Sequence, residues 1–301
     1  RVRLEKRHDF LLFHDSIVEM GCQVFFVNRI TGILQKFPME TELTLPTRCG
    51  IIRWESNWFG FSVIREEYRL QKGYINREEA FRYMGHKGGV IPDHILELAD
   101  QCEQQLLQVM EPRYTYKVFD LSAGDTGIRV GATPLYLEGK DIAAHLEHWT
   151  RCIFFCATLS AGVDRLIRTY EAREMEKAVI TDCMASSAVE QLCNDAEAEI
   201  EAQLGNAVHY TWRFSPGYGD FPLAVQRQFL DLLDAPRKIG VTVTDRLILI
   251  PRKSVTAVIG ISEKEIPQKR RGCSCCNMRK TCPYKIGRAH VWTPVTMVHL
   301  V

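Results

Sequence analysis

The chain has 301 residues and a net charge of +1, with 46% hydrophobic and 25% charged residues. These values are typical of a globular protein of one large or two small domains, and they create no overall field that would attract nucleic acid or a membrane surface. No apolar run approaches the ~18 residues needed to cross a bilayer, and residues 1–7 do not begin a secretory signal. We therefore expect a cytoplasmic protein with no nucleic-acid or membrane partner. Because Arg1 stands in place of an initiating Met, we expect that residue 1 is not the true start.

Eleven cysteines are present, and most stand alone in apolar surroundings. Isolated cysteines of this kind are typical of small core residues in a reducing compartment. This group is Cys22, Cys49, Cys102, Cys152, Cys156, Cys183 and Cys193. The other four cysteines are close together near the end of the chain and are considered below.

Residues 1–72 show weak helical periodicity and irregular turn signals. Strand-like runs occur at 23–27, 50–54 and 58–64. We interpret this segment as an N-terminal extension of uncertain status, either a divergent addition or upstream sequence that does not fold.

A regular pattern begins at Asn76. Asn76 and Glu79 resemble a capping box, which predicts a short helix that the glycine-rich residues 85–89 end. A second helix is predicted between Pro92 and Glu111, because apolar residues recur there at helical spacing. The further elements are predicted in this order: strands at 114–121, 128–130 and 134–137, a helix at 140–149, a strand at 151–159, a long helical stretch at 163–204, a strand at 207–214, a helix at 223–233, and strands at 241–244, 247–250 and 254–261.

The run at 151–159 is almost continuously apolar, which is typical of a central strand covered on both faces. Together the elements predict an α+β fold, with a mostly antiparallel twisted sheet packed with helices.

The stretch from Arg213 to Asp220 reads Arg-Phe-Ser-Pro-Gly-Tyr-Gly-Asp. A guanidinium next to a tight glycine turn favours a site for a small anionic or zwitterionic ligand. A plain connection from strand to helix has the same ingredients, so both interpretations stay open. Glu190, on the long preceding helix, is likewise either a solvated glutamate or a carboxylate that faces a pocket.

The elements 213–218, 239–245 and 250–256 together resemble the activation (reactivation) domain of cobalamin-dependent methionine synthase, in its stand-alone form. The resemblance covers residues 74–285. It implies binding of S-adenosylmethionine and a role in the reductive methylation of cob(II)alamin in methionine biosynthesis. The implied partners are a short cobalamin-dependent methionine synthase, which carries the cobalamin, and a flavodoxin-type electron donor.

Residue by residue, the resemblance implies a ligand site whose members share one turn and the helix before it: Glu190, Arg213, Ser215, Gly217 and Tyr218. Arg213 suits the ligand carboxylate, and either Glu190 or Asp220 balances its positive charges. A family tyrosine on the last strand aligns with Ile259, so that contact is missing or replaced. This departure also leaves open a degenerate scaffold that has lost its ligand.

The enzyme status is open as well. The resemblance implies an accessory domain or subunit of a methyltransferase, and the chain contains no complete synthase active site and no catalytic residue that we can assign. Residues 264–285 are basic and hold Cys273, Cys275, Cys276 and Cys282. This spacing suits zinc or an iron–sulfur cluster, which gives an alternative function as a metal or iron–sulfur electron-transfer protein. A flexible basic tail without metal remains equally open.

Residues 286–301 resemble the translation of a sequencing adapter, and we exclude them from the fold. The expected organisation is therefore an extension at 1–72, an activation-like domain at 73–263, a basic cysteine-rich tail at 264–285 and a non-native tail at 286–301.

Overall fold

The computed structural model describes the strands at residues 41–47, 50–57 and 60–65, and then residues 70, 72–86, 88–124, 127–205, 208–264 and 266. The strand expected at 23–27, the tail at 286–301 and all of the tail at 264–285 except residues 264 and 266 lie outside these ranges.

The main sheet has six strands in the order β6-β5-β4-β7-β11-β8, and its neighbouring strands are antiparallel. Its strands are β4 (Arg113–Ala123), β5 (Ile128–Val130), β6 (Tyr136–Leu137), β7 (Arg151–Thr158), β8 (His209–Tyr210) and β11 (Ser254–Ser262). The central strand β7 pairs along its length with β4 and β11. The predicted fold class and the predicted central strand are both confirmed.

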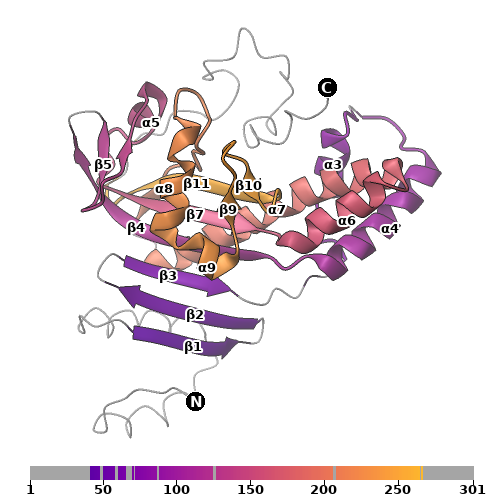
Figure 1. The fold of residues 1–301 in the computed structure, drawn as a ribbon, viewed down its shortest axis with the longest axis horizontal. Helices are drawn as coiled ribbons and strands as arrows, with labels where there is room; N and C mark the ends of the chain where they lie inside the picture. The colour runs from indigo at the N-terminus through magenta and orange to yellow at the C-terminus, as the bar shows by residue number, and fades with distance from the viewer. Residues whose placement is uncertain are drawn as a thin grey trace, which may run out of the picture.

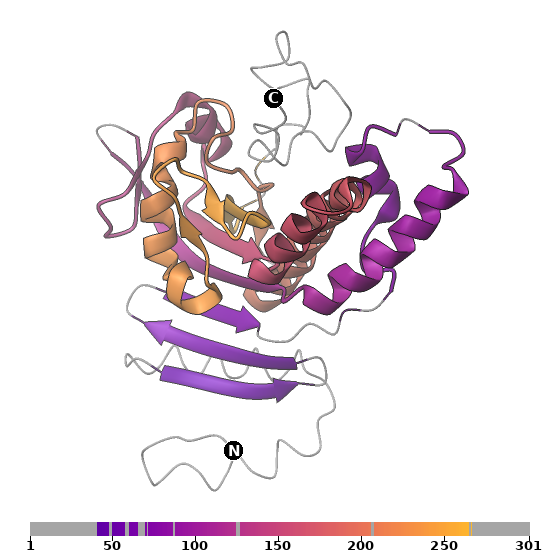
Figure 2. The same ribbon diagram turned by 45° about the vertical axis from the view of Figure 1, so that its right-hand side comes forward.

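Helices cover both faces of this sheet (Figures 1 and 2). They are α3 (Arg77–Tyr83), α4 (Asp93–Val109), α5 (Lys140–His145), α6 (Ala161–Glu171), α7 (Met175–Leu204), α8 (Gln226–Leu233) and α9 (Ala235–Ile239), with a 3-10 turn at Leu223–Val225. In Figure 2, α3, α4, α6 and α7 lie on one side of the sheet, and α8 and α9 lie on the other. A two-stranded antiparallel pair, β9 (Thr242–Val243) and β10 (Leu249–Ile250), completes this part of the fold.

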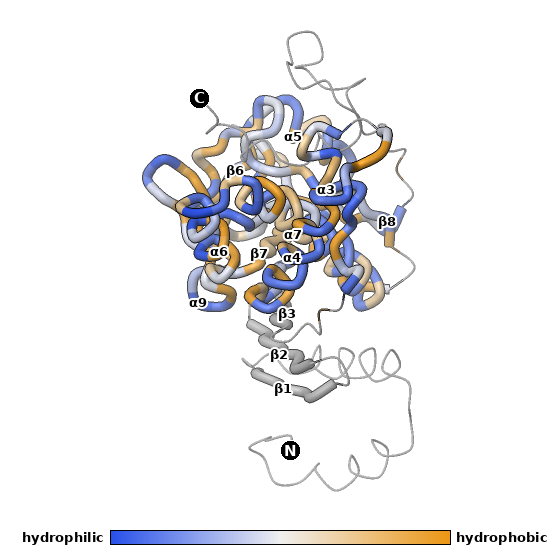
Figure 3. The backbone as a smooth tube through the Cα atoms, turned by 90° about the vertical axis from the view of Figure 1, so that its right-hand side faces the viewer, coloured by the Kyte–Doolittle hydropathy of each residue, from blue (hydrophilic) through white to orange (hydrophobic). Residues whose placement is uncertain are grey.

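Each face of the sheet contributes to its own hydrophobic core, because successive side chains of a strand point to opposite faces. In β7, Ile153 and Phe155 belong to the core under α7, whereas Phe154 and Cys156 belong to the core under α8. The outer helices are amphipathic, and hydrophilic and hydrophobic residues alternate along α4 in Figure 3. Four of the isolated cysteines, Cys102, Cys152, Cys156 and Cys193, are buried free thiols, as predicted, whereas Cys183 is half-buried.

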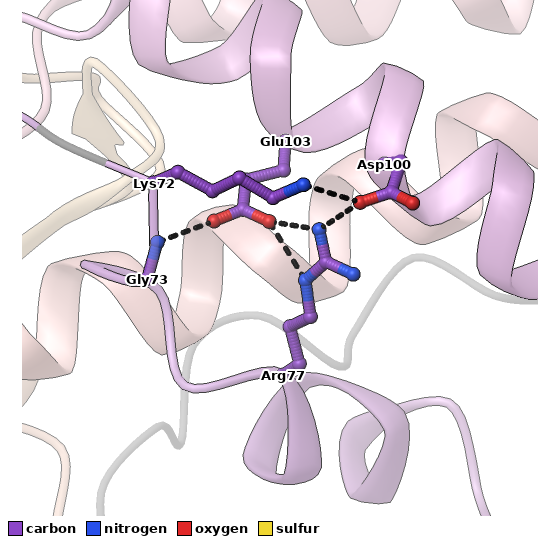
Figure 4. A network of polar contacts seen from close by, with 5 residues as sticks. All are labelled: Lys72, Gly73, Arg77, Asp100 and Glu103. Atoms are coloured by element: carbon purple, nitrogen blue, oxygen red, sulfur yellow. Dashed lines mark hydrogen bonds and ion pairs between the residues drawn. The ribbon is translucent and has the colours of Figure 1, made fainter.

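The predicted cap of the first helix is confirmed, since the Asn76 side chain accepts a hydrogen bond of 3.0 Å from the Glu79 amide. The Glu79 side chain does not complete a capping box here, because it pairs with Arg82 one turn later. α3 is also tied to α4 by buried Glu103, whose carboxylate accepts from the Gly73 amide at 3.0 Å and from the Arg77 guanidinium (Figure 4).

Several element boundaries differ from the prediction, and three of the differences concern the elements around the candidate site. The helical stretch at 163–204 is two helices, α6 and α7, because the chain turns after Glu171 through hydrogen bonds from Arg173 and Glu174 to the Tyr170 carbonyl. The helix at 140–149 already ends at His145. The strand at 207–214 is reduced to β8 and one isolated bridge between Phe214 and Val258.

The N-terminal strands form a separate antiparallel sheet of β1 (Thr41–Thr47), β2 (Gly50–Asn57) and β3 (Gly60–Arg65). The strand runs expected at 50–54 and 58–64 correspond to β2 and β3. In Figure 1, β3 lies beside β4. Over the described part of the chain, no helix has the length and apolar character that a membrane span requires.

Candidate functional site

Helix α7 carries a line of polar residues: Asp182, Ser186, Glu190, Asn194 and Glu197. Residues three or four apart lie on the same side of a helix, so these side chains form one polar strip on an otherwise largely buried helix. Two buried cations from distant parts of the chain reach this strip. Lys253 contacts Asp182 at the start of this strip, and Arg213 contacts side chains further along it.

Arg213 is 3% exposed, and three α7 side chains hold its guanidinium. Nη1 lies 2.6 Å from Glu197 Oε2, and Nη2 lies 3.0 Å from Asn194 Oδ1 and 3.3 Å from Glu190 Oε2. The backbone explains this direction. Phe214 pairs with β11 and packs in the core under α8, so the preceding side chain points toward α7.

Glu190 is a carboxylate whose side chain is only 12% exposed. Its Oε1 atom is buried and has no hydrogen-bond partner among the described residues. Burial raises the pKa of Glu190 to about 7, because the attraction of Arg213 does not offset the burial and the repulsion from Glu197 and Glu79. The structure therefore brings Glu190 and Arg213 into contact, and their role as ligand-binding residues stays a prediction.

Helix α3 also packs against α7 close to these residues. The Ser187 hydroxyl donates to the Asn76 carbonyl at 2.8 Å, which fixes the start of α3 against α7. Tyr83 follows Asn76 by two turns of α3, and Glu190 follows Ser187 by one turn of α7. Burial, followed by the charges of Glu190 and Glu79, raises the pKa of Tyr83. The four-residue spacing of Glu79 and Tyr83 was a signal for this helix face in the sequence.

Hydrogen bonds within its own backbone hold the turn that follows Arg213. The Tyr218 amide donates to the Ser215 carbonyl at 3.1 Å, and the Gly217 amide donates to the Phe221 carbonyl at 2.9 Å. Gly217 has a φ of 88°, which explains why glycine occupies this position. The Tyr218 ring packs edge-on against Phe214, with ring centres 5.1 Å apart. Tyr218 therefore packs against the core under α8, whereas Arg213 and Glu190 meet on the α7 side.

Asp220 caps helix α5. Its two carboxylate oxygens accept from the Lys140 amide at 2.7 Å and the Asp141 amide at 2.9 Å, and these hydrogen bonds lower its pKa. In return, the Asp141 carboxylate accepts from the Asp220 amide at 3.2 Å. The Asp220 carboxylate is therefore occupied by α5, whereas Glu190 has an oxygen that can face the positive charge of a ligand.

Ile259 is 3% exposed and lies in the core under α7, where it faces Ile153 of β7. Its side chain is part of the apolar core and offers no hydroxyl contact.

Lys253 anchors the turn before β11 to the same helix. Its ammonium lies 2.9 Å from Asp182 Oδ1 and donates to Ser186 Oγ at 2.9 Å, and the residue is 2% exposed. Both partners of this ammonium belong to α7. We therefore interpret Lys253 as a structural cation of the polar strip.

In the part of the chain that the structure describes, no group of three or more histidine, cysteine or acidic side chains could hold a metal ion. The candidate metal ligands Cys273, Cys275, Cys276 and Cys282 lie outside that part, so their role stays a prediction.

No family model and no curated protein sequence matches the chain. The chain is similar to one reactivation domain among solved structures. This is a crystal structure described as the MetH reactivation domain bound to AdoHcy, with 14% identity, a TM-score of 0.48, and coverage of 63% of this chain and 74% of that one. A TM-score below 0.5 at such identity is too low to assign a function, so the site is assessed from its own residues.

Proposed function

We propose that this protein binds S-adenosylmethionine between α7 and the segment after β8. The observation that carries this proposal is the Glu190 carboxylate, which is held by Arg213 through one oxygen and has a second, buried oxygen with no hydrogen-bond partner among the described residues. A buried carboxylate that lacks a full set of hydrogen bonds is costly, and a cationic group that fills the vacancy is stabilised there.

The charges around Arg213 support a cationic ligand. Its guanidinium faces two carboxylates, Glu190 and Glu197, so the group has an excess of negative charge when both are ionised. S-adenosylmethionine carries an ammonium, a sulfonium and a carboxylate, and therefore a single net positive charge. In addition, the motif from Arg213 to Tyr218 is the part of the sequence that resembles the activation domain of methionine synthase.

The biological role that fits this ligand is the reductive reactivation of a cobalamin-dependent methionine synthase. In this proposal the chain is the stand-alone activation module. It supplies the methyl donor, the partner synthase carries the cobalamin, and a flavodoxin-type protein supplies the electron. Its own residues bind and orient the ligand, and no general acid or base is required of them.

Calorimetric titration of S-adenosylmethionine into wild-type protein and a Glu190→Gln variant tests the site. We expect the variant to bind ~10–100-fold more weakly, because a charge-assisted contact is worth ~1.5–3 kcal/mol. Glu201→Gln is the matched control, since Glu201 is an exposed residue on the same helix and should leave the affinity unchanged. Equal affinities of wild type and Glu190→Gln would remove Glu190 from the site.

A further inference from the structure

Helix α5 packs against the two residues that flank Arg213 in the chain. The His145 ring, at the end of α5, lies edge-on to the Trp212 ring, with ring centres 4.6 Å apart, and its centre is 4.8 Å from that of the Phe214 ring. Ring centres about 4.5–7 Å apart are typical of packed aromatic pairs. His145 therefore contacts the residue before Arg213 and the residue after it.

Arg213 points away from this contact. Trp212 and Phe214 pack with the core under α8, whereas the Arg213 guanidinium meets α7, because successive side chains of an extended segment point to opposite faces. Two backbone hydrogen bonds with Val258 of β11, of 2.8 and 2.9 Å, fix Phe214 in this place. His145 therefore acts on Arg213 from the opposite face, through the backbone of residues 212–214.

The start of α5 is joined to the other end of the same segment. The Asp141 carboxylate accepts from the Asp220 amide at 3.2 Å. It also lies so close to Gly219 that a Cβ at that position would collide with Asp141 Oδ2. The helix itself is anchored, since Ile142 is fully buried in the core under α8. One anchored helix thus holds residues 212–220 at both ends, beside the chain that leads into α8 (Figure 1).

The contact that depends on this segment is a long one. Arg213 Nη2 lies 3.3 Å from Glu190 Oε2, whereas Nη1 lies 2.6 Å from Glu197 Oε2. Hydrogen bonds between nitrogen and oxygen are usually ~2.7–3.2 Å long. A small displacement of residues 212–214 would therefore break the contact with Glu190 before the contact with Glu197.

We propose that α5 is a positioning element of the candidate site, in which His145 and Asp141 fix the segment that aims Arg213 at Glu190. This inference rests on the proposed function, and it adds two residues that act without touching the ligand. They determine how the Glu190 carboxylate is held, and therefore how it meets the cationic group of the ligand.

The test is calorimetric titration of the full chain with S-adenosylmethionine, in His145→Ala, in Glu190→Gln and in the double variant. We expect His145→Ala to weaken binding ~3–10-fold, which is a part of the ~10–100-fold expected for Glu190→Gln. In the Glu190→Gln background the same change should have little effect, because there is no carboxylate left to position. His145→Phe keeps a ring against Trp212 and Phe214 and should restore most of the affinity.

Phe119→Ala is the control for a general loss of packing. Phe119 contributes a buried ring to the same core from β4, 5.0 Å from the Phe154 ring. Its removal should lower the melting temperature and leave the affinity unchanged. If His145→Ala has no effect on binding, or weakens it equally with and without Glu190, the inference is wrong while the proposed function stands. If the wild type does not bind S-adenosylmethionine, both fail together.

A pair of glycine variants tests the same helix without removing a core ring. Gly219 and Gly240 have φ values of 58° and 72°, so alanine strains the backbone at both positions. At Gly219 the new Cβ also displaces the Asp141 carboxylate, whereas at Gly240 it meets nothing within 4 Å in the described part of the chain. We expect Gly219→Ala to weaken binding and Gly240→Ala to leave it unchanged. Equal affinities of the two variants would overturn the inference, and this pair decides it if His145→Ala does not fold.

Discussion

Glu190 and Arg213 show how a buried ion pair can leave one partner incompletely satisfied. Arg213 has two carboxylates and an amide oxygen within reach, whereas Glu190 shares the guanidinium with Glu197 and Asn194. Burial of a carboxylate raises its pKa, and here the neighbouring acidic groups add to the effect. The carboxylate of Glu190 is therefore poised to gain either a proton or a cationic ligand.

The stability of the protein should depend on pH through Glu190. Its pKa is about 7 in the folded protein and 4.5 as an ordinary value, so folding favours the protonated form. The stabilising contribution is fully present below about pH 4.5 and is lost as the pH rises through 7. Relative to Glu190→Gln, the wild type should lose up to ~3 kcal/mol between these limits, at about 1.36 kcal/mol per pKa unit.

Urea unfolding of wild type and Glu190→Gln at several pH values between about 5 and 8 measures this difference. Parallel stability profiles for the two proteins would contradict the account. Glu201→Gln again serves as the control, and its profile should follow that of the wild type.

Removal of Arg213 should be strongly destabilising. Arg213→Ala leaves Glu190 and Glu197 without their shared cation, and the loss of one partner from a buried ion pair costs ~3–5 kcal/mol. Arg213→Lys should recover only part of this loss, because an ammonium cannot reproduce the planar fork of the guanidinium. The exposed pair of Arg227 and Asp245 gives the control, since Arg227→Ala should change the unfolding free energy by under ~1 kcal/mol. Similar values for Arg213→Ala and Arg227→Ala would show that the Arg213 contacts contribute nothing.

At the scale of elements, the position of α3 depends on a clamp at its start (Figure 4). Glu103 of α4 is 1% exposed, and its two oxygens bind the Gly73 amide and the Arg77 guanidinium. Asp100, one turn earlier, pairs with Arg77 and Lys72 at the surface. The inner carboxylate thus fixes the chain that leads into α3, while the outer one adds an exposed contact.

Glu103→Ala should therefore cost ~1–3 kcal/mol in urea unfolding, because it leaves the Gly73 amide without its partner and takes from the half-buried Arg77 guanidinium the inner of its two carboxylates. Asp100→Ala is the natural comparison, since it removes an exposed carboxylate from the same network and should have only a small effect. Equal losses for the two variants would mean that burial does not determine the strength of this clamp.

The sequence predicted elements well where the signal was local and less well where it depended on distant contacts. The Asn76 cap, the apolar run of β7 and the stop of α7 at Gly205 are all encoded within a few residues. The break between α6 and α7 has no glycine or proline to mark it, and backbone hydrogen bonds around Tyr170 define it instead. β8 is shorter than predicted because the regular ladder with β11 ends at Tyr210. Beyond it, Thr211 forms hydrogen bonds with Gly260, partly through its side chain, and Phe214 forms an isolated bridge.

For the whole molecule, α7 is the element that connects the two halves of the chain. It packs on α3, α4 and α6, which precede it in the chain, and on β11, which follows it, and its polar strip contacts Lys253 and Arg213. The family resemblance implied that Glu190 and Arg213 belong to one site, whereas the residues alone left Glu190 open as a solvated glutamate. The contribution of α3 was harder to predict, because the spacing of Glu79 and Tyr83 marks a helix face but not the helix that it packs against.

The central claim is that this chain holds one molecule of S-adenosylmethionine. Its most direct test is calorimetric titration of the full wild-type chain with this ligand. We predict saturable binding at one ligand per chain, accompanied by a rise in melting temperature that grows with ligand concentration, as linkage requires. The absence of saturable heat, together with a melting temperature that does not change at high ligand concentration, would contradict the account.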